Sequence, residues 1–246
     1  EDNMIKNSSR VDFSLPEKLD CQFAGRRKTA FTLAEVLITL GIIGIVAAMT
    51  LPSLIQKHQE RVTVNKVKKF YSVMSQAQLL AIKDNGYVDE WDVPAEPNGM
   101  NIESITAFMN YMKPYLKIVK DCGGDRCFKT DYVVYYLNGS RYNIPDRLPS
   151  IYKLILIDGS YMWLRGSNHE HCKGWDGGRG GDVCANLAYD INGDRPPNIV
   201  GRDIFTFYFT KNALFADVSN DCNLNNEGWG CSSWILEKGN MDYLKK

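Results

Sequence analysis

The 246-residue chain has few of the groups that the common hydrolytic enzymes use. It contains three histidines, no G-x-S-x-G sequence around a serine nucleophile and no H-E-x-x-H sequence of a zinc protease. It also has no net charge, because 29 Lys and Arg residues balance 29 Asp and Glu residues. General nucleic-acid binding requires a basic surface and is not indicated. These absences predict a protein that is not an enzyme.

One long apolar segment dominates what is present. No ionisable side chain occurs from residue 36 to residue 55. As a helix these about 20 residues would extend roughly 30 Å, enough to cross the hydrocarbon core of a bilayer. Gly41 and Gly44 suit a membrane helix that packs closely on another, and Pro52 should kink the helix or leave a carbonyl group free. The segment therefore predicts a membrane-spanning helix.

A single carboxylate, Glu35, stands at the start of this segment, and a basic cluster precedes it. The cluster is Arg26-Arg27-Lys28, followed by Thr29-Ala30 and then by Phe31. A charge at bilayer depth costs several kcal/mol unless it is paired, so an intramembrane Glu is a functional hypothesis by default.

The order of basic run, junction, Phe31, Glu35 and apolar span resembles the class III leader of type IV pilins and type II secretion pseudopilins. In that family a prepilin peptidase cuts on the cytoplasmic side, and the new N-terminal residue, usually Phe, is N-methylated. The resemblance implies cleavage after Ala30 and methylation of Phe31. It also implies that Glu35 pairs with the free amine of a neighbouring subunit. Ala30 replaces the family's usual Gly, so we expect slower or conditional cleavage.

The resemblance implies a structural subunit of a type II secretion pseudopilus or a type IV pilus. Its partners would be the prepilin peptidase/methyltransferase, other pilin or pseudopilin subunits, an inner-membrane assembly platform and the lipid bilayer. The chain would cross the bacterial inner membrane once, with its C-terminal domain periplasmic or extracellular, and would join a filament after assembly. The size and cysteine content of the domain favour a minor or specialised subunit.

A secretory signal peptide is the first alternative. Arg26 to Lys28 would form its basic region, and Val46-Ala47-Ala48 would supply the cleavage site. The apolar stretch continues past Ala48 to Ile55, and a Glu inside the apolar region of a signal peptide is unusual. Both features favour the pilin-like interpretation.

A second alternative is a membrane-anchored extracytoplasmic module that binds a ligand such as a glycan and does not assemble. Four tryptophans of the C-terminal part motivate it, although most tryptophans belong to cores: Trp163, Trp175, Trp229 and Trp234. Glu35 distinguishes the two interpretations, since an anchor does not need this charge and a filament does.

Six cysteines remain once a leader containing Cys21 is removed. An even set in an exported chain is typical of disulfides. Six cysteines allow 15 connectivities. Proximity in the sequence favours three local pairs, which are Cys122–Cys127, Cys172–Cys184 and Cys222–Cys231. They would place the C-terminal part in an oxidising compartment.

Zinc is the rival interpretation of these cysteines. Cys122-x4-Cys127 and His169-Glu-His171-Cys172 contain zinc-ligand types. The CxxC spacing of a structural zinc site is missing, so disulfides are the favoured prediction.

The chain divides into four predicted parts: a cytoplasmic leader 1–30, a transmembrane assembly helix 31–56, an amphipathic continuation 57–84 and a globular domain 85–246. The continuation carries one apolar stripe at three- and four-residue steps, and Asn85-Gly86 should end the helix. The stripe comprises Val64, Val67, Phe70, Tyr71, Met74, Ala77, Leu80 and Ala81.

The globular domain should combine one short helix with hairpins. We expect a helix at 102–112, a strand at 132–137, and two hairpins. The hairpins would pair 152–157 with 161–164 through a type I′ turn at Asp158-Gly159, and 204–209 with 213–216 around Lys211-Asn212. The predicted class is α+β, with an antiparallel sheet laid on the long helix. This arrangement also resembles the pilin fold.

Oxygen ligands at alternate positions form a candidate calcium site at Asp190, Asn192 and Asp194, with Asp203 nearby. Several pseudopilins bind calcium in a C-terminal loop. The segment departs from an EF-hand, because Arg195 stands in place of the Gly and Gly201 in place of the bidentate Glu. The alternative is an Asx-rich turn between two strands.

Overall fold

The computed structural model describes residues 32–94, 102–142, 145–166, 172, 183–218 and 222–245. The chain divides into two compact units, Glu1–Thr50 and Leu51–Lys246. The longer helices and the strands are α1 (Leu33–Asn85), α2 (Ile102–Met112), β1 (Ile118–Gly123), β2 (Tyr152–Leu156), β3 (Tyr161–Gly166), β4 (Val183–Asp190), β5 (Ile204–Thr210), β6 (Leu214–Ala216) and α3 (Cys231–Lys238). Short 3-10 helices are η1 (Val88–Glu90), η2 (Lys113–Tyr115), η3 (Pro145–Arg147) and η5 (Asp242–Leu244). The predicted α+β class is confirmed.

The sheet is antiparallel, and its six strands lie in chain order from β1 to β6. Both of its faces are covered, so the residues of β5 are buried almost throughout. Phe205, Phe207 and Phe209 belong to the core cluster that contains α1 and α2, whereas Ile204 belongs to a second cluster with Trp163. The period of two along a strand thus divides β5 between two cores.

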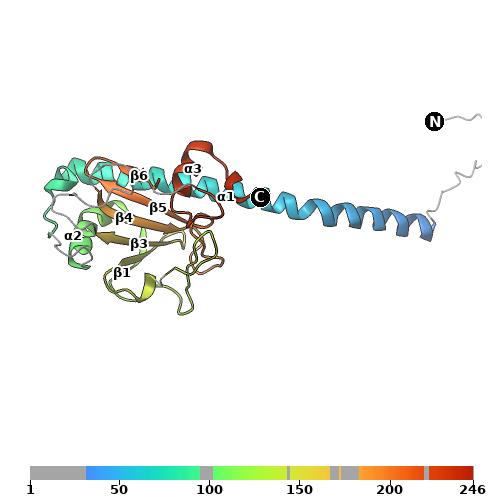
Figure 1. Cartoon of the computed structure of the whole chain (residues 1–246), viewed down its shortest axis with the longest axis horizontal. Helices are drawn as coiled ribbons and strands as arrows, with labels where there is room; N and C mark the ends of the chain where they lie inside the picture. The colour runs from blue at the N-terminus through green and yellow to red at the C-terminus, as the bar shows by residue number, and fades with distance from the viewer. Residues whose placement is uncertain are drawn as a thin grey trace, which may run out of the picture. The chain divides into compact units, whose positions relative to one another are not determined.

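The later part of α1 covers one face of the sheet (Figure 1). The Phe70 ring stacks on Tyr189 with 3.7 Å between centroids and lies 5.5 Å from Phe207. The Gln78 side-chain amide donates to the carbonyl of Thr210 at 2.7 Å. The predicted stripe is confirmed except at Leu80, which is exposed. The buried positions along this stripe are Val64, Val67, Phe70, Met74, Ala77, Gln78 and Ala81.

The helix α2 and both predicted hairpins are present, but the predicted strand at 132–137 is wrong. This segment forms only isolated bridges, from Tyr135 to Arg141 and to Ile199. Tyr132 and Val134 are instead buried in the second core cluster, against the face of the sheet away from α1. The β-branched and aromatic residues that suggested a strand therefore serve as packing groups of an irregular segment.

The turn between β2 and β3 also differs from the prediction. Leu156 N–H donates to the Ser160 carbonyl at 3.0 Å, and Gly159 N–H donates to the Leu156 carbonyl at 2.9 Å. Gly159 has a φ of 79°, and among the described non-glycine residues only Cys172 and Asn198 have a positive φ. A type I′ turn needs positive φ at both central residues, so this connection is a three-residue loop closed by Gly159.

Among the described strands and α-helices, three had no expected counterpart: β1, β4 and α3. The β4 sequence VCANLAYD contains alanines and an asparagine, which have low β-propensity, so its period of two was weak. Helix α3 has only eight residues, and no side chain caps its N-terminus. Its C-terminus is clear, since Gly239 follows in the left-handed conformation that commonly ends helices.

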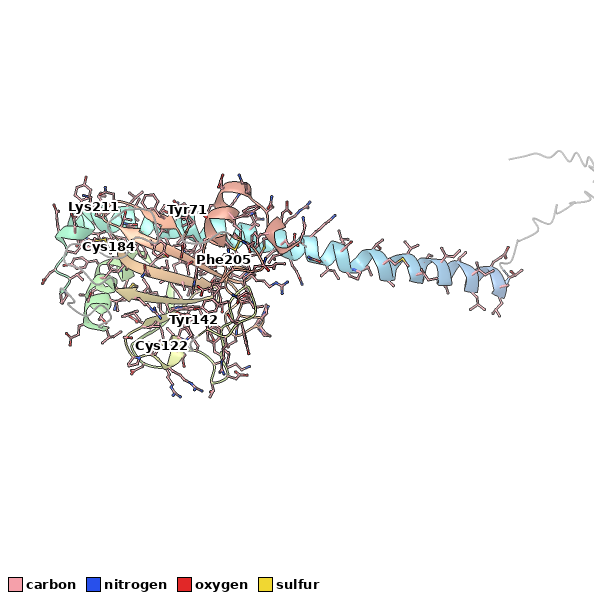
Figure 2. All side chains as sticks on the ribbon, viewed as in Figure 1. Tyr71, Cys122, Tyr142, Cys184, Phe205 and Lys211 are labelled. Carbon is pink, nitrogen blue, oxygen red and sulfur yellow. A yellow bond between two sulfur atoms is a disulfide. The ribbon has the colours of Figure 1, made fainter. Side chains whose placement is uncertain are left out.

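The structure contains three disulfides, and they join the partners that proximity suggests: Cys122–Cys127, Cys172–Cys184 and Cys222–Cys231. The first starts from β1, the second is anchored in β4 and the third holds the first residue of α3. Cys122 and Cys184 can be followed in Figure 2. Thiolate ligands for zinc are therefore not available from these residues, and His169 and His171 lie outside the described residues.

Candidate functional site

The first turn of α1 holds Glu35 in a capping box. The Thr32 backbone N–H and the Thr32 hydroxyl each donate to Glu35 Oε2 at 2.8 Å. In return, the Glu35 N–H donates to Thr32 Oγ1 at 3.2 Å. A Thr at the cap and a Glu three residues later satisfy each other's free N–H groups in this way. Ala30 and Phe31, the predicted cleavage and methylation residues, lie outside the described residues.

This cap gives Glu35 a local role that the sequence reasoning missed. The signal was present as T-x-x-E directly before the apolar run. A carboxylate in the first turn is also favoured by the partial positive charge of a helix N-terminus. An anchor helix could therefore use Glu35 without any filament, and the presence of this residue alone does not separate the two interpretations.

The apolar side chains that follow in α1 are exposed. This helix contains the one candidate membrane span among the described residues, with a mean hydropathy of 2.2 and no part of that window buried. So many exposed apolar groups in one stretch mark a contact with lipid or with other proteins. The large ones are Leu33, Val36, Leu37, Ile38, Leu40, Ile42, Ile43, Ile45, Val46, Met49, Leu51, Leu54 and Ile55.

Polar groups within the span are bonded to the helix itself. The hydroxyls of Thr39 and Thr50 donate to the carbonyls of Val36 and Val46, at 3.0 and 2.9 Å. Such internal bonds are what a segment in hydrocarbon requires. The helix continues through Pro52 as one element. Because Pro has no N–H, the helix loses one backbone bond there.

Small residues leave open space on the same span. A Cβ added at Gly41 or at Gly44 would meet nothing within 4 Å. In membranes, such small positions allow another helix to approach closely. The surface is therefore suited to helix–helix contact as well as to lipid.

The second candidate site is the loop between β4 and β5, where the structure brings Asp190, Asn192 and Asp203 together. Asp190 Oδ1 accepts the N–H groups of Asn192 and Gly193, each at 3.0 Å. The Asn192 side-chain amide donates to Asp203 Oδ2 at 3.1 Å, and the N–H of Asn198 donates to the same oxygen at 2.8 Å. The loop is thus an Asx-rich turn in which the carboxylates of Asp190 and Asp203 are buried and that of Asp194 is exposed.

Burial raises the pKa values of both carboxylates of this pair. Burial is the main cause for Asp190, and the charge of Asp203 adds to it, so that the pKa rises to about 7. The Tyr132 hydroxyl donates to Asp190 at 2.7 Å and opposes the rise. Burial raises the pKa of Asp203 as well. A bound cation would stabilise the ionised forms of these two carboxylates.

The oxygen atoms that could bind a cation differ from the set predicted from the sequence, which included Asp194. Asp194 accepts a hydrogen bond from the hydroxyl of Tyr161. Within the described part of this loop, two buried amide oxygens have no hydrogen-bond partner, those of Asn192 and Asn198. Asn198 was not among the predicted ligands. Its backbone is left-handed, with a φ of 53°, a conformation that Asn adopts more often than most residues but that the sequence alone does not reveal. Within the described ranges, no three His, Cys, Asp or Glu side chains are grouped to hold a metal ion.

Comparisons with protein families gave two matches. Residues 53–232 match a family of unknown function (DUF6613), and residues 25–51 match the prokaryotic N-terminal methylation motif. Neither the curated proteins nor the solved structures gave a match. The methylation motif is characteristic of type IV pilins and pseudopilins, so the predicted resemblance is confirmed and the chain is a precursor of this type.

Proposed function

Because the chain belongs to the family of unknown function DUF6613 and carries the N-terminal methylation motif, we propose that it is a structural subunit of a pilin-like filament. Prepilin peptidase cuts after Ala30 and methylates Phe31. The subunit then joins a type II secretion pseudopilus or a type IV pilus through α1. The observation that carries this proposal is an exposed apolar helix surface that begins with a carboxylate at its N-terminal turn.

The covalent steps fit the geometry at the start of α1. Cleavage frees the amine of residue 31, one residue before Thr32, whose N–H already donates to Glu35. Methylation keeps the positive charge of this amine. Both capping bonds go to one carboxylate oxygen, Oε2, and a carboxylate can accept more hydrogen bonds than these two. Glu35 can thus cap its own helix and accept the amine of a staggered neighbour.

A specialised place in the filament is supported by the second unit. Leu51–Lys246 is a compact unit with a six-stranded sheet and three disulfides, more than a simple shaft subunit needs. We therefore propose that the chain is a minor or specialised subunit and that this domain lies outside the cytoplasm, where disulfides persist.

Calcium is the ion that we propose for the loop between β4 and β5. Asp190 and Asp203 would supply carboxylate oxygens, and the unpartnered amide oxygens of Asn192 and Asn198 would complete a set of hard oxygen ligands. The cation would offset the repulsion that raises the pKa of Asp190.

A matched pair of substitutions separates the filament role of Glu35 from its capping role. Glu35→Gln removes the charge but keeps a side chain that serves in a capping box. Thr32→Val removes the cap hydroxyl but keeps the charge. We expect Glu35→Gln to insert and fold normally and to be absent from sheared filaments or pseudopili, while Thr32→Val is still incorporated. Cysteine crosslinking and immunoblotting of the sheared fraction measure incorporation.

The opposite pattern would overturn the assembly role. If Glu35→Gln is incorporated as the unchanged chain is and Thr32→Val is not, Glu35 acts only as a helix cap. Membrane-fraction abundance and protease resistance of the domain serve as controls for insertion and folding.

A further inference from the structure

A pocket lies on the face of the sheet that α1 does not cover. It has a volume of about 270 Å³. Its floor consists of two adjacent cross-strand rows from β3, β4 and β5. Strand register places these residues side by side on one face, as Arg165–Asn186–Tyr208 and Trp163–Ala188–Thr206. In Figure 2, Tyr142, which borders the pocket, and Tyr71 of α1 lie on opposite sides of the sheet.

Aromatic rings form the walls of this pocket. Tyr136, Tyr142 and Trp229 meet edge to face, with centroids 5.3 to 5.7 Å apart. Hydrogen bonds hold the segments that carry them. Trp229 Nε1 donates to Glu227 at 2.8 Å, and the N–H of Leu137 donates to the Glu227 carbonyl at 3.0 Å. The three rings are only half-buried, so part of each ring surface can contact a ligand.

The polar groups of the floor are satisfied unequally. Asp217 accepts hydrogen bonds from the hydroxyls of Thr206 and Tyr208. Arg165 Nη2 donates to the Tyr142 hydroxyl at 3.0 Å, one of the five N–H groups that a guanidinium offers. The buried side-chain oxygen of Asn186 lies between Arg165 and Tyr208 in the same row, and it has no hydrogen-bond partner among the residues that the structure describes. A buried acceptor without a donor costs stability and marks a place for a ligand donor.

These groups restrict the chemistry of a ligand. It must offer a donor to Asn186 and an acceptor to Arg165, and it must present apolar surface to the rings. An anion would face the carboxylate of Asp217, and a cation would face the guanidinium of Arg165. A neutral ring with several hydroxyls meets all three requirements, since each hydroxyl both donates and accepts. The volume is just below the roughly 300–1,000 Å³ of pockets for drug-sized ligands, which suits one such ring.

We propose that this pocket binds a single neutral sugar residue of a glycan, with the ring against the aromatic walls and its hydroxyls on Asn186 and Arg165. Such a subunit would contact a polysaccharide outside the cytoplasm. The proposal does not depend on filament assembly, because all the residues that form the pocket belong to the unit Leu51–Lys246.

The test uses the full chain in a detergent without a sugar headgroup. Saturation-transfer NMR is recorded with the methyl glycosides of glucose, galactose, mannose and N-acetylglucosamine, and tryptophan fluorescence gives the affinity. Choline and acetate serve as cationic and anionic probes. We expect at least one glycoside to bind with a Kd in the millimolar range or tighter and to receive saturation on its ring protons. Absence of binding by all four glycosides, or stronger binding of choline or acetate, would overturn the proposal.

Substitutions locate the binding. Asn186→Leu should weaken it about tenfold or more, the loss of one well-formed hydrogen bond to a ligand, while the melting temperature stays equal or rises because an unsatisfied oxygen is removed. Arg165→Gln should weaken it too. Arg147→Gln removes the same charge from an exposed position outside the pocket and should change nothing. Unchanged binding by Asn186→Leu would contradict the assignment.

Discussion

Two stretches of one helix, α1, differ in the exposure of their apolar side chains. Between residues 33 and 55 they occur on all sides and are exposed, as Ile43 is at 63%. Between residues 64 and 81 most of them form one buried stripe, as Phe70 does with 5% exposed, and only a few, such as Leu79, are exposed. The membrane-length window in the first stretch is not buried, whereas the second stretch packs on the chain's own sheet.

The difference shows that apolar content alone does not define the partner of a helix. A helix that is apolar all round needs lipid or other subunits, and one with a single stripe needs one packed face. Residues 33–55 therefore depend on a surrounding that the chain itself does not provide, and residues 64–81 contribute to the stability of the domain.

The largest expected effect comes from truncating one side chain in each stretch. Phe70→Ala should lower the free energy of unfolding of the domain by about 3–5 kcal/mol, because it removes a buried ring that stacks on Tyr189. Ile43→Ala, the matched control, should change it by less than about 0.5 kcal/mol. Denaturant unfolding of the full chain in micelles, followed by tryptophan fluorescence, measures both. Equal effects would remove the distinction between the stretches.

The state of the disulfides shows whether the domain on which residues 64–81 pack folds in an oxidising compartment. Replacing Cys222 and Cys231 together by Ala should cost about 2–3 kcal/mol in the chain-entropy picture, since a loop of nine residues is opened. The processed, unreduced protein should show no free thiol when it is labelled in denaturant. Two or more labelled thiols would contradict the disulfide assignment.

A smaller effect concerns the loop after β4, which the packed stretch reaches through Lys66, whose Nζ donates to the Ile191 carbonyl at 2.8 Å. The raised pKa of Asp190, about 7, means that the folded chain keeps a proton that the unfolded chain loses near pH 4. Unfolding then releases a proton, so this group makes stability fall as pH rises from about 4 to 7.

Calcium should oppose this fall in stability. At about ten times its Kd, the ion would add about 1.4 kcal/mol at pH 8, and less at pH 5 where it competes with the proton. Melting curves with calcium and with chelator, for the unchanged chain and for Asp190→Asn, measure the effect. A melting temperature that ignores both calcium and chelator at pH 8 would reduce this segment to a turn.

The sequence predicted the features that depend on long or strong patterns. The extent of α1, the buried stripe around Phe70 and the hairpins that contain Gly159 and Lys211-Asn212 follow from periodicity and turn residues. Strand β4 was missed because alanine and asparagine have low β-propensity, so only its tertiary contacts identify it as a strand. The segment around Tyr132 was assigned to a strand because its residues suit both a ladder and a core.

The sites show the same division. Glu35 and the methylation motif lie in a local pattern that can be read directly, although the capping partner Thr32 was overlooked. The pocket could not be predicted, because Trp163, Asn186 and Trp229 meet only through strand register and a distant loop. Asn198 donates its backbone N–H to Asp203 through the conformation of the short loop between them, which the order of residues did not reveal.

The most direct test of the account is the mature N-terminus. Intact mass and N-terminal peptide analysis of the protein from membrane fractions should give a chain that starts at N-methyl-Phe31. That result would establish the exposed stretch of α1 as the assembly helix of a processed subunit. A chain that starts at Met49 would show that this stretch is a secretory signal peptide, and the filament proposal would be wrong.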